Sequence, residues 1–266
     1  MIEADVHVHT EISSDCVASI ESMIESALAK GLKAMCITDH QDIEYPVKGE
    51  FQFDTDVYFK VLQQYKEKYA EKIDVRIGVE IGLQPHLGAF YQQYAKSYSF
   101  DFIIGSIHVV EGYDPYYPEF FEKYEDKEGY RRAFRESISC LKQVQDFDVL
   151  GHIDYIVRYG KEKAVQYSYK MFADEIDEIL RLIIEKGKGI EINTSGLRYG
   201  LGFTHPHIDV IKRYKELGGE VITVGADAHK PEDVGSYFNE TSQILRQAGF
   251  EYYTEFQKRE PVFKKI

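Results

Sequence analysis

Seven short runs rich in valine, isoleucine or phenylalanine recur along this chain, and most of them end in a histidine or an acidic residue. The runs cover residues 3–9, 33–39, 74–81, 101–110, 147–153, 189–194 and 220–226. At or just past the carboxyl ends of six of them stand His7 and His9, His40, Glu80, His108, His152, and Asp227 with His229. Histidine binds transition metals and a carboxylate can bridge two ions, so this mixture favours Zn, Mn or Fe over Mg or Ca. The pattern predicts a polynuclear metal site on one rim of a parallel sheet, and with it metal-assisted hydrolysis.

Segments of helical period separate these runs, among them 19–31, 170–187 and 207–219. A regular alternation of strand and helix predicts parallel strands joined by crossover helices. In a (β/α) barrel many strand ends converge on the carboxyl face, whereas an open doubly wound sheet would bring fewer of them together. We therefore predict an α/β fold, a seven-stranded barrel of the TIM-barrel type. No stretch of the 266 residues is typical of a linker, which predicts a single domain over 1–266.

Two segments depart from the alternation. The segment 111–127, EGYDPYYPEFFEKYEDK, is long, acidic and rich in aromatic residues. We predict that it forms a loop overhanging the ligand-bearing face, as a lid or a pocket wall. The run 250–258, FEYYTEFQK, predicts a short additional edge element.

Two pairs of ligand-type residues share the same spacing. His7 and His9, in VHVHT, are two residues apart, so on a strand both imidazoles project from the same side. Asp227 and His229, in VGADAH, repeat that spacing at the end of the seventh run, which a closed barrel places beside the first. Taken alone, either pair is compatible with ordinary core or surface residues. Together they predict that two ligand pairs face each other where the barrel closes.

Other ionisable residues stand inside apolar runs. An unpaired carboxylate or imidazole is costly to bury, and this applies to Glu80 in IGVEIG and His108 in GSIHVV. Metal coordination removes that cost, and a salt bridge or a hydrogen bond in the core is the alternative. His86 lies away from the run ends and reads as a structural or surface residue, while His205 and His207 read as neighbours of the site.

Three aspartates lie close to the predicted ligands in the sequence. Asp39 precedes His40 and Asp154 follows His152, and we expect both aspartates to orient the ligands. Asp15, in SSDC, lies outside any strand-like run. From its position alone, a role as the N-cap of the following helix competes with a role as a metal ligand.

The charge and the cysteine content narrow the class of partner. A net charge of -13 argues against a nucleic-acid backbone as the main partner, because phosphate contacts need clustered lysine and arginine. No apolar run approaches the ~20 residues of a membrane span, and the amino end lacks a signal-peptide pattern. Cys16, Cys36 and Cys140 contain no C-x-x-C pair, which favours a reducing compartment. We predict a small-molecule substrate and a cytoplasmic location, while nothing in the sequence indicates the oligomeric state.

Six strings carry a resemblance to a known family. DVHVHT, ITDH, GVEIG, GSIH, GHIDY and GADAH together resemble the polymerase and histidinol phosphatase (PHP) family over nearly the whole chain. The string INTSGLR and the chain length are similar to the free-standing histidinol-phosphate phosphatase branch. The resemblance implies a distorted seven-stranded barrel with a trinuclear centre of Zn, Mn or Fe. It carries ligand roles over to nine positions: His7, His9, Asp15, His40, Glu80, His108, His152, Asp227 and His229.

The resemblance also implies a reaction. L-histidinol phosphate would be hydrolysed to L-histidinol and phosphate, in histidine biosynthesis, by attack of a metal-bridging hydroxide on phosphorus. We assign catalytic roles to Glu80, Asp227 and His229, and substrate contacts to His40, Arg158 and Arg198. A planar guanidinium matches phosphoryl oxygens bidentately, although a surface ion pair is the alternative for each arginine.

The leaving group carries an amine and an imidazole, which acidic and aromatic walls would suit. The segment 111–127 offers such groups in Glu111, Tyr113, Asp114, Tyr116, Tyr117 and Glu119. Two other functions compete with this interpretation. A PHP-type phosphoesterase acting on nucleotides or another small phosphate ester is disfavoured by the charge. A metal-binding module without activity is disfavoured because every ligand position is filled.

Overall fold

Seven parallel strands pair in the order β1-β2-β4-β5-β6-β7-β8 in the computed structural model, which describes residues 2–266. Their bounds are β1 Ala4–Val8, β2 Ala34–Ile37, β4 Asp74–Gly82, β5 Phe102–Ser106, β6 Val149–Leu150, β7 Gly189–Asn193 and β8 Ile222–Gly225. A short strand β3, His40–Gln41, follows β2 after a break and also pairs with β4. The His9 N–H donates to the Ala228 carbonyl at 2.9 Å, which brings the end of β1 beside the segment after β8. The sheet is thus a nearly closed barrel, and the predicted architecture is confirmed.

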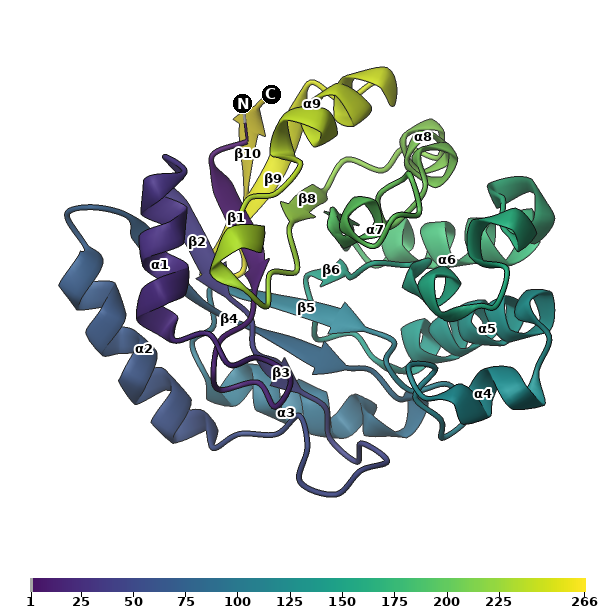
Figure 1. The fold of residues 1–266 in the computed structure, drawn as a ribbon, viewed down its shortest axis with the longest axis horizontal. Helices are drawn as coiled ribbons and strands as arrows, with labels where there is room; N and C mark the ends of the chain where they lie inside the picture. The colour runs from purple at the N-terminus through teal and green to yellow at the C-terminus, as the bar shows by residue number, and fades with distance from the viewer. Residues whose placement is uncertain (1) are drawn as a thin grey trace.

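Helices cover the outside of the barrel (Figure 1). Their bounds are α1 Ile20–Ala29, α2 Thr55–Tyr69, α3 Gly88–Ser97, α4 Pro118–Lys123, α5 Asp126–Gln143, α6 Ala173–Glu185, α7 Ser195–Arg198, α8 Ile208–Glu216 and α9 Phe238–Gln247. Short 3₁₀ turns cover Pro85–Leu87, Tyr155–Tyr159, Lys163–Gln166, Tyr169–Phe172 and Pro231–Asp233. Helices α1 and α2 lie on one side of the strands, and α5 and α6 lie on the opposite side (Figure 1). Among residues 2–266, no helix combines the length and apolar character that crossing a bilayer requires.

The strands present apolar side chains to two separate cores. The larger core lies between the strands and the helices and includes Ile77, Val79 and Ile81 of β4. A smaller core gathers side chains from β1, β2, β5 and β6, so it lies inside the barrel. Its members are Ala4, Val6, Ala34, Cys36, Phe102, Ile104, Val149 and Phe256.

A two-stranded antiparallel hairpin closes the amino end of the barrel. It consists of β9, Tyr252–Gln257, and β10, Glu260–Lys265. The ring of Phe256 stacks on Phe102, the first residue of β5, with centroids 5.0 Å apart. The edge element predicted at 250–258 is therefore β9, and its side chain Phe256 closes the inner core at the amino end of the barrel.

Strand β4 is one of the strands of the barrel wall and carries a charged residue near each of its ends. Arg76 and Glu80 lie on the same face of this strand because successive side chains alternate. Between them, a β-carbon on Gly78 would lie 2.7 Å from the Cys36 sulfur and 2.9 Å from the Phe102 carbonyl oxygen. Only glycine fits at position 78, so tightly packed atoms fill the space between Arg76 and Glu80.

The prediction that 111–127 forms a loop is wrong for the second part of the segment. Helix α4 lies within this segment, and α5 begins before it ends. Pro118 suits the first helical position, and Phe120 and Phe121 are buried against the core, so packing stabilises a helix here.

Candidate metal centre

A cavity of about 510 Å³ opens at the carboxyl ends of the strands. Seven of the nine predicted metal ligands line it: Asp15, His40, Glu80, His108, His152, Asp227 and His229. The remaining two, His7 and His9, are fully buried beside them. The structure thus brings all nine residues to one place, and the ion-pair distances below describe how they meet.

Glu80 lies at the middle of this cluster. Its Oε2 atom lies 3.2 Å from His7 Nε2 and 3.1 Å from His40 Nδ1. Its Oε1 atom lies 2.9 Å from His152 Nε2 and 3.3 Å from His108 Nε2. A single carboxylate therefore reaches imidazoles that come from four separate segments of the chain. This is the geometry expected of a residue that bridges two ions.

Asp227 lies where β8 meets β1. Its Oδ1 atom is 3.3 Å from His9 Nε2 and 3.8 Å from His7 Nε2. The backbone of Asp227 has a φ of 53°, in the left-handed region that non-glycine residues rarely adopt. Such a conformation persists only when the surroundings enforce it, and here it turns the carboxylate toward the two histidines.

Asp15 comes from the loop after β1. Its Oδ2 atom lies 3.0 Å from His229 Nε2 and 3.7 Å from His40 Nε2. Ser19 caps α1, because its side chain accepts from the Ser22 N–H. The alternative prediction that Asp15 is the N-cap is therefore wrong.

Hydrogen bonds hold several of the imidazoles through their Nδ1 atoms. The Nδ1–H of His7 donates to Glu191 Oε1 at 2.6 Å, and that of His108 donates to Asp42 Oδ2 at 2.7 Å. The Nδ1 atom of His9 contacts Ser13 Oγ at 3.3 Å. Each of these bonds leaves Nε2 as the atom available to an ion.

Asp39 and Asp154 differ in how they relate to their neighbouring histidines. Asp39 accepts from Ser13 Oγ at 2.8 Å, and the same Oγ accepts from the His40 N–H at 3.0 Å. Asp39 therefore supports His40 only through Ser13. Asp154 bonds His205 Nδ1 at 2.7 Å and not His152, so the expectation that it orients its neighbour is wrong.

The donor set fits divalent ions. The Nε2 atoms of His7 and His9 lie 3.1 Å apart, and with both protons on Nδ1 their lone pairs repel unless a cation lies against them. Among the described residues, Glu80 Oε2, His152 Nδ1 and His229 Nε2 are buried without a hydrogen-bond partner, which is costly. Three groups bring their ligand atoms within 4.8 Å of one another: His9, His40 and His229; His7, His9 and Glu80; and His40, Glu80 and His108.

The acids and imidazoles of this cluster shift one another's pKa values: against the effect of burial, the neighbouring carboxylates raise the pKa of His40 to about 9 and hold the pKa values of His7 and His108 well above their usual range. Burial alone would raise the pKa of the Glu80 carboxyl, but His7, His108 and His40 hold that pKa well below its usual range. The pKa of Asp227 is likewise held well below its usual range, against burial, by His7 and His9. Burial, with the neighbouring imidazoles of His229 and His40, lowers the pKa of His9 to about 3. Ionised carboxylates and neutral imidazoles are the forms that bind metal, so the imidazoles with a raised pKa release a proton when an ion binds.

The two predicted arginines differ in their surroundings. Arg158 lines the cavity, and its guanidinium carbon lies 4.6 to 5.3 Å from the ring centres of Tyr155, Tyr159 and Tyr199. It donates to the Tyr159 hydroxyl but forms no ion pair with any carboxylate of residues 2–266, which leaves a partly buried cation suited to an anion. Arg198 instead lies outside the cavity lining: it donates to the backbone carbonyls of Ala226 and Asp227, at 2.9 and 2.8 Å, and forms the ion pair predicted as its alternative role, with Asp233 at 3.4 Å. Its phosphate contact stays a prediction.

Half of the acidic and aromatic groups predicted for the leaving group line the cavity. Asp114, Tyr116 and Tyr117 do so, and Asp114 accepts a hydrogen bond from Tyr45. The other half face elsewhere, because Glu111 pairs with Arg132 at 2.6 Å and Tyr113 and Glu119 lie outside the lining.

Several residues of the site escaped the sequence analysis. Glu191 and Asp42, which bond the ligand histidines, were not predicted, nor were Lys163 and Lys230, which line the cavity. Glu191 had a readable signal, since a lone acid in the apolar string GIEIN matches the environment of Glu80. Asp42 and Lys230 lie in loops and Lys163 begins a 3₁₀ turn, so no strand or helix periodicity in the sequence indicates where these side chains point.

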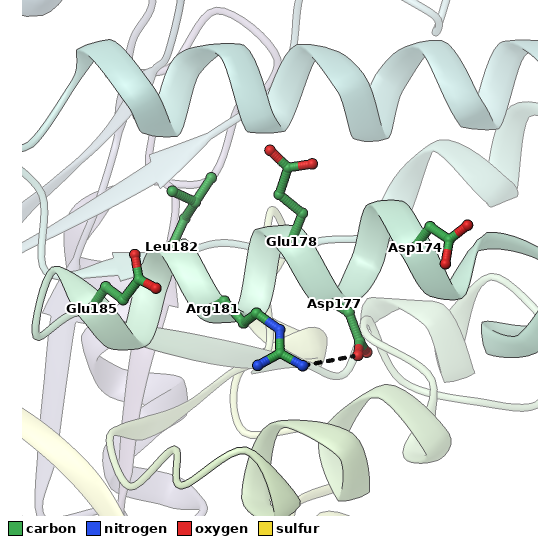
Figure 2. Close-up of a pocket in the computed structure, with 6 residues that line it drawn as sticks. All are labelled: Asp174, Asp177, Glu178, Arg181, Leu182 and Glu185. Atoms are coloured by element: carbon green, nitrogen blue, oxygen red, sulfur yellow. Dashed lines mark ion pairs between the residues drawn. The ribbon is translucent and has the colours of Figure 1, made fainter.

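A second depression, of about 420 Å³, lies on the outer face of α6 (Figure 2). Its side chains are Asp174, Asp177, Glu178, Arg181, Leu182 and Glu185, with Arg181 3.7 Å from Asp177. It contains no imidazole and its acids face solvent. This surface is a solvated helix face.

Comparisons with known proteins agree with this geometry. Residues 5–195 match the PHP domain family. A probable histidinol-phosphatase of Clostridium acetobutylicum is 36% identical over 88% of this chain and 89% of its own length. The histidinol-phosphatase of Lactococcus lactis is 28% identical over 96% of this chain and 95% of its own. A crystal structure of the Lactococcus lactis histidinol phosphate phosphatase, complexed with zinc, L-histidinol and phosphate, superposes with a TM-score of 0.89 over 98% of both chains, at 26% identity.

Proposed function

This chain belongs to the PHP domain family, and on that premise we propose that it is a histidinol-phosphatase. The enzyme hydrolyses L-histidinol phosphate to L-histidinol and phosphate, in a metal-dependent reaction of histidine biosynthesis. The observation that carries the proposal is the convergence of buried imidazoles on the Glu80 carboxylate at the cavity floor. The zinc, L-histidinol and phosphate bound by the Lactococcus lactis relative support the same substrate and cofactor class.

The metal centre is proposed to hold three divalent ions, of Zn, Mn or Fe. Its ligands are the nine residues His7, His9, Asp15, His40, Glu80, His108, His152, Asp227 and His229. Ions in such a site lower the pKa of a water toward neutrality and polarise the phosphoryl oxygens.

The chain's own residues position the substrate around this centre. Arg158 offers guanidinium N–H groups to the phosphoryl oxygens, and the rings of Tyr155, Tyr159 and Tyr199 fix its direction. His40 lies on the cavity wall within reach of the same group. Glu80, Asp227 and His229 would be catalytic because they would hold the ions that activate the attacking water.

The outer part of the cavity receives the leaving group. Asp114 supplies a negative charge for the amine, and Tyr116 and Tyr117 supply aromatic faces for the imidazole. No protein nucleophile is needed, since the phosphoryl acceptor is water.

The proposal treats residues 1–266 as one domain, because the inner core joins strands from β1 to β6 with Phe256 of the carboxyl-terminal hairpin. It also includes a cytoplasmic location, which agrees with three cysteines that are all free.

A comparison of substrates tests the proposal. Phosphate release is measured with L-histidinol phosphate, a nucleoside monophosphate and a phosphodiester, each with and without a chelator. We expect chelator-sensitive release that is fastest with L-histidinol phosphate. Preference for the nucleotide or the diester would support another PHP-type phosphoesterase, and no release from any substrate would support a metal-binding module without activity.

A further inference from the structure

Glu191, in the middle of β7, is a fully buried acid that none of the proposed ligand groups includes. Both of its carboxylate oxygens are engaged. Oε1 accepts from His7 Nδ1 at 2.6 Å. Oε2 accepts from the His152 backbone N–H at 3.1 Å and from Asn193 Nδ2 at 3.2 Å. One carboxylate thus links two proposed metal ligands that come from β1 and from the end of β6.

The neighbouring glycines leave room for this arrangement. A β-carbon on Gly225 would lie 2.3 Å from His7 Cβ and 2.6 Å from Glu191 Oε1. A β-carbon on Gly151 would lie 2.5 Å from Ser106 Oγ and 3.6 Å from Glu191 Oε2. Any larger residue at position 225 would displace His7 or the carboxylate. The packing is therefore built around the contact between these two side chains.

The direction of His7 follows from this contact. Its Nδ1 atom faces Glu191, while its Nε2 atom faces Glu80 at 3.2 Å and His9 at 3.1 Å. A carboxylate oxygen accepts a hydrogen bond only from a protonated nitrogen, so a proton sits on Nδ1, and Nε2 is the atom that faces the ligand cluster.

We propose that Glu191 is a positioning residue for the metal centre, which acts by fixing the orientation and tautomer of His7 and by tying the end of β6 to β7. This inference rests on the proposed metal centre. Partners of this kind typically contribute about 10–100-fold to metal affinity.

Glu191→Gln is the informative substitution because it keeps the size of the side chain. The amide has one acceptor and one donor group, whereas the site presents donors on every side. Asn193 cannot turn its amide to compensate, since its Oδ1 accepts from the Ser195 N–H and Oγ. A glutamine with its oxygen toward His7 would face the His152 N–H with its NH₂ group. A glutamine turned the other way would favour the wrong His7 tautomer.

The test is a zinc titration of metal-free protein against a chromophoric chelator, together with a thermal melt of the same metal-free protein. The control is Glu255→Gln, another buried acid, which bonds Arg76 and Tyr253 at the opposite end of the barrel. We expect Glu191→Gln to bind zinc about 10–100-fold more weakly at one site, while Glu255→Gln binds zinc as the wild type does. Histidine ¹⁵N spectra of the zinc-loaded protein should show the Nδ1-protonated form of His7 only while Glu191 is present.

Glu191→Asp provides a second variant, since it keeps the charge but withdraws the carboxylate by one methylene. It should bind zinc less tightly than the wild type even if Glu191→Gln folds poorly. Zinc affinity equal to wild type in a folded Glu191 variant, or a loss of melting temperature in the metal-free Glu191 variants with unchanged zinc binding, would overturn the inference. A wild-type protein that binds no zinc would instead refute the proposed metal centre itself.

Discussion

The two ends of the barrel both bury acidic residues, yet they neutralise them differently. At the amino end Glu255 lies 2.9 Å from Arg76, and Asp148 lies 2.9 Å from Arg259. At the carboxyl end Glu80 and Asp227, within the described chain, form ion pairs only with imidazoles, and Glu80 also accepts a hydrogen bond from Ser106 Oγ at 2.6 Å. One end of β4 thus carries its own cation, and the other end carries an acid without one.

This difference indicates where the missing positive charge comes from. Burying a charge is costly unless it is paired and hydrogen-bonded. The amino end meets this requirement with arginine and needs nothing from outside. At the carboxyl end Glu80 Oε2 and His229 Nε2 lie close to ligand atoms of neighbouring side chains but form no hydrogen bond within the described chain, as expected of a site that is completed by metal ions.

Of all the substitutions considered, Glu80→Gln at the carboxyl end should have the largest effect. Glu80→Gln removes the charge that several imidazoles share, so we expect kcat to fall by roughly three orders of magnitude and the metal content to drop. Phosphate release and elemental analysis measure the two effects. Near-normal turnover in this variant would show that Glu80 is not a bridging ligand.

The two arginines sharpen the comparison within the carboxyl end. Arg158→Ala should lower kcat/KM by roughly 10²-fold at unchanged metal content, because within the described chain its guanidinium hydrogen-bonds only the neutral Tyr159 hydroxyl and is left to pair with the phosphate. Arg158→Lys should recover little, since a point charge lacks the planar fork.

Arg198→Ala is the matched variant. Loss of metal together with activity would show that Arg198 supports the Asp227 turn through the backbone carbonyls. Loss of activity alone would support the predicted phosphate contact. Wild-type kinetics for Arg158→Ala would return that residue to a structural role.

At the amino end, Glu255→Gln should destabilise the fold without changing turnover or metal content. The change removes a charge-assisted bond to Arg76, which we expect to lower the free energy of unfolding by about 1–3 kcal/mol. Denaturant unfolding of the metal-free protein gives that value. Turnover and metal content per folded chain should match the wild type, and a loss of either would mean that the two ends are coupled.

The outer face of α6 should show the smallest effect. Glu178 pairs with Lys142 at 2.7 Å, but both side chains are about half exposed. We expect Glu178→Gln to change the free energy of unfolding by less than about 0.5 kcal/mol and to leave metal content and kcat unchanged. A measurable loss of activity would give the depression in Figure 2 a role that its solvated acids do not indicate.

Much of the barrel was predictable because strand and helix periodicity is a local property. The strand that carries Glu80 was predicted correctly from its apolar residues alone, and so was β5, although β5 ends at Ser106, before His108. The helix inside 111–127 was not, since its turn-like residues outweighed the pair Phe120 and Phe121 that buries it. Tertiary packing overrode the local signal there.

The site was predictable where a ligand sits on a strand and less so where it depends on a distant partner. The i, i+2 spacing of His7 and His9 set their common direction, and the fold brought them beside Glu80. The pairing of Asp154 with His205 spans 51 residues and has no local signature. The orientation of Arg198 toward a backbone turn is likewise a property of the folded chain.

The metal stoichiometry of the active protein tests the central claim most directly. The measurement is elemental analysis of protein purified without added metal, on the same sample whose L-histidinol phosphate turnover is recorded. The account predicts about three divalent ions per chain, because nine ligands exceed what one ion and its water can use. It also predicts that activity disappears with the metal on chelation. One ion per chain in fully active enzyme would contradict it.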